Sequence, residues 1–117
     1  MPRKLGEFEQ LLLFAILRLG ADAYGVRIRQ EIEERTGRTI SVGAVYTGLD
    51  RLQSRELVIS WLGDSTPERG GRRRKFYRLE PEGAALLRGS YAGLKAMAAG
   101  VERRLSALAE RAGTFLP

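Results

Sequence analysis

The sequence predicts a mainly α-helical chain that contains one small β-hairpin and ends in a long helix. Two observations predict this class. Apolar residues recur at helical spacing in four segments of the 117-residue chain. Between the third and fourth segments, the β-branched and aromatic run LVISWLG (57–63) is followed by the turn residues DSTPERGG and then by RRRKFYRL (72–79). That order is typical of two strands joined by a turn.

The first helix is expected over residues 6–19, with Gly20 as its C-cap. Its segment LLLFAIL (11–17) is apolar almost all the way round, so a single buried stripe cannot account for it. We therefore expect this helix to be packed on two sides. Leu13 and Leu17 are its candidate contacts to a second molecule.

The second and third helices follow after short connections. Asp22 is the expected N-cap of the second helix, which ends at Gly37, and Ser41 caps the third helix over residues 41–54. Four apolar residues form the inward stripe of the third helix: Val42, Val45, Leu49 and Leu52. The opposite face carries small residues, hydroxyls and arginines, namely Gly43, Ala44, Tyr46, Thr47, Gly48, Arg51 and Arg55. It is smooth enough to lie close against another surface, unlike a solvated face of alternating Glu and Lys.

The positive charge is concentrated in the third helix and the hairpin. The chain has a net charge of +6, and residues 38–78 hold nine Lys/Arg and four Asp/Glu, a net of +5. Such concentration indicates a docking face for a polyanion, although a solvated basic hairpin would have the same composition. In the second strand, Tyr77 should face the core, while Arg74 and Phe76 share the other face.

The last helix carries an a/d heptad seam, formed by Leu87, Tyr91, Leu94, Ala98, Val101, Leu105, Leu108 and Ala112. The outer end of this helix has no obvious partner within the chain, so a second copy of the chain is the simplest partner for the seam. The alternative is a bundle with the first helix of the same chain. We therefore divide the chain into a first domain at 1–83 and a dimerisation helix at 84–117.

Several functions are excluded or disfavoured. The chain has no histidine and no cysteine, which removes Ser-His and Cys-His nucleophile pairs and the usual zinc sites. We expect no enzyme, no catalytic or metal-binding residues and no cofactor. No apolar run approaches a membrane span and no signal-peptide pattern is seen, so we expect a cytoplasmic protein.

A helix-turn-helix followed by a basic hairpin is the winged-helix arrangement. In it the third helix enters the major groove of double-stranded DNA and the hairpin, or wing, reaches the backbone or the minor groove. Wing arginines can bind phosphates bidentately and release counterions.

The chain also resembles the PadR-like transcriptional regulators, in AYGVRI (23–28), in SVGAVYTGLDRLQSRELV (41–58) and in GGRRRKFYRLEPEGAALL (70–87). The resemblance is to short members with one C-terminal dimerisation helix. It implies a bacterial repressor that acts as a homodimer, in a family where some members respond to small hydrophobic or phenolic effectors. The DNA-binding residues that follow from the charge pattern and the resemblance are Tyr24, Ser41, Gly43, Ala44, Tyr46, Thr47, Arg51, Arg72, Arg73 and Arg74.

Trp61 is the one tryptophan, and it either packs on the hairpin or lines an effector pocket. The chain departs from the family at Gln53, Glu56 and Glu80, where Glu, Gly and Thr are usual. Three rivals to a sequence-specific regulator remain. The first is a basic module that binds nucleic acid non-specifically or binds RNA, and the second is a winged helix whose basic wing binds an acidic protein partner. The third is a protein that only senses a ligand.

Overall fold

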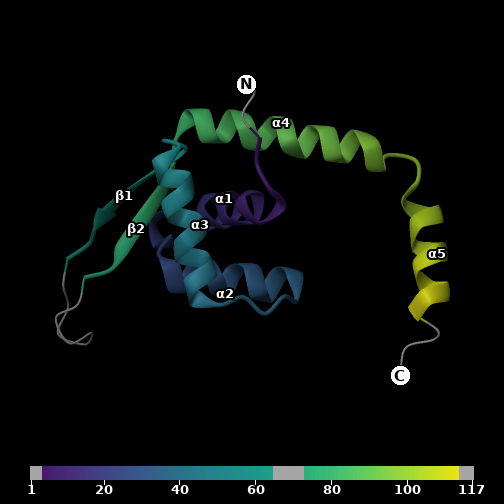
Figure 1. Cartoon of the computed structure of the whole chain (residues 1–117), viewed down its shortest axis with the longest axis horizontal. Coiled ribbons are helices and arrows are strands. Elements are labelled where there is room, and N and C mark those ends of the chain that lie inside the picture. Colours follow the sequence, from purple (N-terminus) through teal and green to yellow (C-terminus); the bar gives the residue numbers. More distant parts are fainter. Residues whose placement is uncertain (1–3, 65–72, 114–117) are drawn as a thin grey trace.

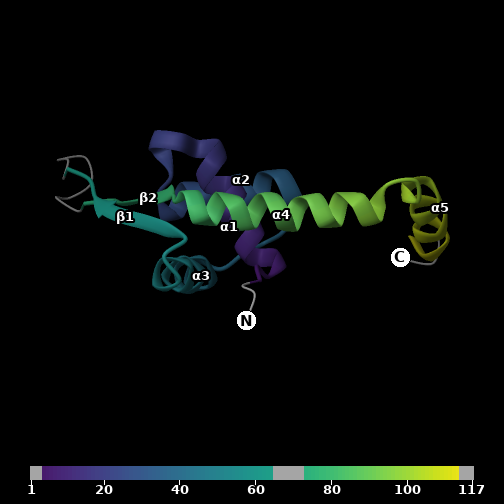
Figure 2. The same ribbon diagram turned by 90° about the horizontal axis from the view of Figure 1, so that it is seen from above.

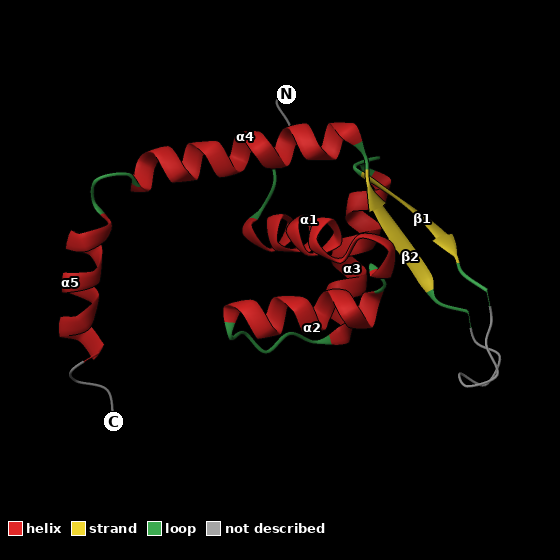
Figure 3. Ribbon diagram, turned by 180° about the vertical axis from the view of Figure 1, so that it is seen from behind, coloured by secondary structure: helices red, strands yellow, loops and turns green. Residues whose placement is uncertain are grey.

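The computed structural model describes residues 4–64 and 73–113 and confirms a mainly helical chain with one two-stranded hairpin (Figure 1). In chain order the elements are α1 (Glu7–Leu19), the 3-10 turn η1 (Gly20–Asp22), α2 (Gly25–Thr36), α3 (Val42–Ser54), β1 (Val58–Leu62), β2 (Lys75–Leu79), α4 (Pro81–Ala98) and α5 (Glu102–Gly113). The helices α1, α2 and α3 lie together under α4, the hairpin projects from one end, and α5 stands at the far end of α4 (Figures 1 and 3).

The core lies where α1, α2, α3 and the hairpin meet. Its fully buried side chains include Leu12 and Leu13 of α1, Ile28 of α2, Leu49 of α3 and Tyr77 of β2. The helix α1 contacts α2, α3, β2 and α4, so most of its apolar surface is covered within the chain, and Leu17 stays 61 % exposed. Among residues 4–64 and 73–113, no helix is both long and apolar enough to cross a membrane.

The ends of the three core helices are fixed largely by the predicted caps. Gly20 and Gly37 close α1 and α2 at φ 56° and 73°, and the Ser41 hydroxyl accepts a hydrogen bond of 3.1 Å from the Ala44 amide at the start of α3. Asp22 is not the N-cap of α2, because it lies within η1; Tyr24 occupies that position, with an extended backbone.

The hairpin is antiparallel, in a register that pairs Val58 with Leu79 and Trp61 with Phe76. The strand β2 is shorter than predicted, and the chain just before α2 lies along its other edge. There Tyr24 bridges Phe76, and the Tyr77 amide donates to the Ala23 carbonyl at 2.8 Å. The strand is thus held between β1 and the start of α2.

The C-terminal segment is helical as predicted, in two helices instead of one. Gly100 takes a left-handed φ of 83°, which ends the regular helix after Ala98 and lets α5 start in a new direction (Figure 2). Val101 therefore falls in the connection between the two helices. Every residue of α5 is exposed, whereas Leu87 near the start of α4 is buried in the core.

Candidate nucleic-acid interface

The exposed face of α3 carries most of the residues expected there, but Gly48 is buried and Val42 is exposed. Six candidate residues are exposed: Ser41, Gly43, Ala44, Tyr46, Thr47 and Arg51. Gly48 is buried against α1, where an added Cβ would lie 2.5 Å from Leu12 Cδ1. Val42, expected to face inward, is exposed in the first turn of α3.

Arg55, at the C-cap of α3, ties this helix to the start of the chain. Its guanidinium donates to the Glu9 carboxylate at 3.0 Å and to the Lys4 carbonyl at 2.7 Å. Arg55 was expected on the smooth face, but this half-buried pair turns it toward α1. We therefore regard Arg55 as structural.

A concavity of about 330 Å³ brings the two candidate tyrosines and the cations of the hairpin together. Its lining residues come from the start of α2 with its N-cap, from α3, and from the first residue of β2 with the two residues before it: Tyr24, Gly25, Val26, Tyr46, Arg73, Arg74 and Lys75. Gly25 leaves room for Tyr46, because a Cβ at position 25 would overlap the Tyr46 hydroxyl. The positive end of the α2 dipole opens into the same space.

The two described arginines of the wing are held in different ways, and both precede β2. Arg73 is exposed, and its Nε donates to the Gly63 carbonyl at 2.8 Å. Arg74 lies over the Tyr24 ring, with its guanidinium carbon 4.1 Å from the ring centroid. The Nε of Arg74 is buried and has no hydrogen-bond partner among the described residues. Arg72 lies outside the described residues.

Sequence reasoning missed Gly25 and Val26 as parts of this concavity, which also includes Lys75 of the basic run. The order of elements does not by itself bring the first turn of the second helix beside the hairpin. The start of α2 lies beside β2 because of the bridge between Tyr24 and Phe76, and no local sequence pattern predicts that bridge.

Tyr77 lies in the core as predicted. Burial, with smaller contributions from Asp50 and Tyr46, raises the pKa of Tyr77 to about 12. Its hydroxyl is buried without a hydrogen-bond partner among the described residues. Tyr77 therefore stays neutral at physiological pH and is part of the core on which the hairpin packs.

Trp61 both packs on the hairpin and lines a second, apolar concavity. Its ring stacks on Phe76 at 6.0 Å between centroids, and 43 % of the residue remains exposed. The concavity has a volume of about 360 Å³ and is lined by Ile16, Leu17, Gly20, Ala21, Trp61, Tyr77, Arg78 and Leu79. The two expectations for Trp61 are thus compatible.

The residues assigned to a dimer divide into buried and exposed groups. Leu13 and Leu87 are 0 % and 3 % exposed within the chain, so they belong to its own core and are unavailable to a partner. Ala98 is half-buried. The exposed members are Leu17, Tyr91, Leu94, Val101, Leu105 and Leu108.

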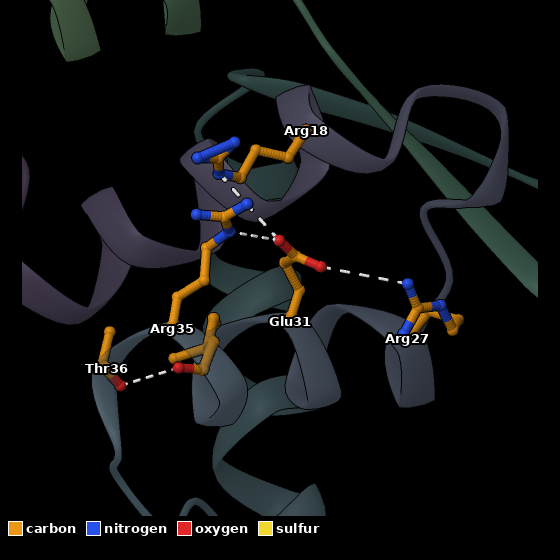
Figure 4. A network of polar contacts seen from close by, with 6 residues as sticks. Arg18, Arg27, Glu31, Arg35 and Thr36 are labelled. Carbon is orange, nitrogen blue, oxygen red and sulfur yellow. Dashed lines mark hydrogen bonds and ion pairs between the residues drawn. The ribbon is translucent and has the colours of Figure 1, made fainter.

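A network of charges, not anticipated as a unit, links the end of α1 to α2 (Figure 4). The Glu31 carboxylate oxygens lie 2.6 Å from a guanidinium nitrogen of Arg35, 3.9 Å from one of Arg27 and 4.0 Å from one of Arg18. The hydrogen bond from Arg35 is the main cause that lowers the pKa of Glu31. The helical spacing of 27, 31 and 35 was visible in the sequence, whereas the approach of Arg18 depends on how α1 packs on α2.

The chain resembles known proteins both in sequence and in fold. The sequence model of the family described as "Transcriptional regulator PadR-like family" matches residues 13–89, more than half of the chain. A protein of Lysinibacillus sphaericus is 32 % identical over 84 residues, which are 70 % of this chain and 72 % of that protein.

Solved structures share the fold over most of its length. A PadR family transcriptional regulator from Eggerthella lenta is 27 % identical with a TM-score of 0.65, over 85 % of this chain and 86 % of that one. A PadR family transcription regulator from Clostridium difficile is 26 % identical with a TM-score of 0.64, over 84 % of this chain and 98 % of that one.

Proposed function

The chain belongs to the PadR-like family of transcriptional regulators, and from that premise we propose that it is a repressor that binds a pseudo-palindromic operator as a homodimer. The family is one of transcriptional regulators and not of enzymes, in agreement with the sequence analysis. A bacterial source and a cytoplasmic location follow from the same proposal.

The observation that carries the proposal is the concavity beside α3, where two tyrosines and three cations converge. An α-helix with small leading side chains fits the major groove, and α3 presents Gly43, Ala44 and Thr47 on its exposed face. With α3 in the groove, Arg73 and Arg74 of the wing would meet the flanking backbone. Contacts to phosphate give affinity, and contacts from α3 to base edges give specificity.

The homodimer is supported by apolar surface that the single chain leaves open. Leu94, Leu105 and Leu108 are 67 %, 65 % and 62 % exposed. An isolated helix as short as α5 is only marginally stable in water, so α5 needs its apolar face packed against another surface. We propose that a second copy supplies it, with residues 84–117 as the dimerisation segment, which places two α3 helices about 34–36 Å apart on DNA.

The test is selection of bound duplexes from a random pool, followed by shift assays over a range of salt. We expect an enriched palindromic sequence and an affinity that falls steeply with salt. Equal binding to all duplexes at low salt would leave only the non-specific nucleic-acid module. Replacing Arg73 and Arg74 with Ala should weaken DNA binding and leave the dimer intact by sedimentation; unchanged DNA affinity would favour an acidic protein partner.

A small hydrophobic effector is a second element of the proposal, favoured by the apolar concavity at Trp61. An aromatic compound that enters it should change the fluorescence of Trp61, the only tryptophan in the chain. Saturable quenching together with a change in DNA affinity would support an effector site. Quenching that is linear in concentration would argue against one.

A further inference from the structure

The outer face of the hairpin carries a continuous row of stacked side chains that begins at the nucleic-acid interface. Arg74 lies 4.1 Å above the ring of Tyr24, and Tyr24 meets Phe76 edge to face at 5.5 Å. Phe76 then stacks on Trp61, and the Arg78 guanidinium lies 5.8 Å from the Trp61 ring. Phe76 is the middle member and contacts both aromatic neighbours.

The backbone holds Phe76 from both edges of β2. Phe76 is paired with Trp61 across the hairpin and bridged to Tyr24 on its other edge. Gly63 leaves room for its ring, because a Cβ at position 63 would lie 2.6 Å from Phe76 Cε1. The Phe76 ring is therefore a fixed reference against which Tyr24 is oriented.

Arg74 depends on that orientation. Its Nε is buried without a hydrogen-bond partner among the described residues, so the Tyr24 ring is the contact that the structure gives to its guanidinium. A guanidinium over an aromatic face keeps its outer N–H groups free for a phosphate. If the ring of Tyr24 turned away, Arg74 would lose this support and would no longer be held where its guanidinium can reach the phosphate.

We propose that Phe76 is a positioning residue of the nucleic-acid interface: without touching DNA, it holds the Tyr24 ring that in turn aims Arg74 at a backbone phosphate. The inference rests on the proposed function, because it assigns Phe76 a role in DNA binding. It predicts that the energetic effect of Phe76 on DNA binding passes through Arg74.

The experiment is a double-mutant cycle with Phe76→Leu and Arg74→Ala, read as anisotropy of a labelled duplex of mixed sequence over a range of salt. Phe76→Leu should weaken binding about tenfold, the change that a loss of roughly 1.4 kcal/mol produces. It should also reduce the salt slope by about one, as the loss of a phosphate contact does. In the Arg74→Ala background, Phe76→Leu should change affinity by less than about twofold.

Matched variants separate positioning from stability. Leu79→Ala removes a half-buried side chain that lies on the opposite face of β2 from Phe76, so it should lower the melting temperature and leave the salt slope unchanged. Phe76→Tyr keeps the ring and should retain wild-type affinity. Phe76→Met, which keeps much of the volume without a ring, repeats the cycle if Phe76→Leu does not fold.

Two results would overturn the inference while sparing the proposed function. One is a Phe76→Leu effect of full size in the Arg74→Ala background, and the other is an unchanged salt slope in Phe76→Leu. A wild-type protein that shows no salt-dependent binding to any duplex would instead refute the proposed function, and this inference with it.

Discussion

Glu56 holds a backbone conformation that suits glycine, and we expect Glu56→Gly to stabilise the fold. It is the one non-glycine residue with positive φ in the described part of the chain, at 61°, in the turn between α3 and β1. A residue with a Cβ loses roughly 1–2 kcal/mol in this region. Glycine recovers that strain but loses about 0.5–1 kcal/mol in chain entropy. The expected net gain is about 1 kcal/mol, or a rise in melting temperature of about 4 °C.

The assay is equilibrium denaturation at one fixed protein concentration, because dimerisation would make the midpoint depend on concentration. The amide of residue 56 donates to the Gln53 carbonyl at 2.9 Å, and glycine keeps this bond. Glu56→Ala is the matched control, since it removes the carboxylate but keeps the Cβ. Equal stability of the Gly and Ala variants would refute the backbone argument and point to the Glu56 side chain.

Three further changes test other parts of the structure. Tyr77→Phe should raise the free energy of unfolding at pH 7 by about 1 kcal/mol, because it removes a buried hydroxyl that has no partner among the described residues. Since the pKa of Tyr77 is raised from 10.0 to about 12, the wild type should lose stability as pH rises through that interval; the Phe variant should lose less, as denaturation at several pH values would reveal. Glu80→Thr should add about 1 kcal/mol, measured by thermal melting, because Glu80 is the N-cap of α4 and makes no side-chain cap bond. Leu105→Asp should dissociate the proposed dimer in sedimentation and weaken binding to the proposed operator at least tenfold, since an exposed apolar residue of α5 would become charged; a dimer that persists would exclude α5 from the interface.

Local patterns predicted most of the fold and the smooth face of α3. The caps at Gly20, Gly37 and Ser41 and the inward position of Tyr77 follow from short-range chemistry. The departure at position 53 is tolerated by the structure. The Ser60 hydroxyl donates to Gln53 at 3.0 Å, a bond that a glutamate would also accept.

The errors occurred where the answer depends on packing between distant segments. Gly48 is buried because Leu12 of α1 needs its space, which the sequence of α3 alone does not reveal. Leu13 was assigned to a partner molecule because the sequence does not show that α4 and the other elements of the same chain pack against α1. The heptad pattern continued across Gly100, but the left-handed turn there divides the helix.

The main-chain bridge between α2 and β2 has a consequence for the entropy of binding. The Tyr77 amide and the Ala23 carbonyl join the two walls of the concavity through the backbone, at 2.8 Å. Bridged strands stand roughly 4.8 Å apart whatever side chains they carry. The spacing between the start of α2 and β2 is therefore set by the backbone. If a polyanion binds in the concavity as proposed, these two bridged segments need not move, and the conformational entropy lost there comes mainly from the side chains that line it.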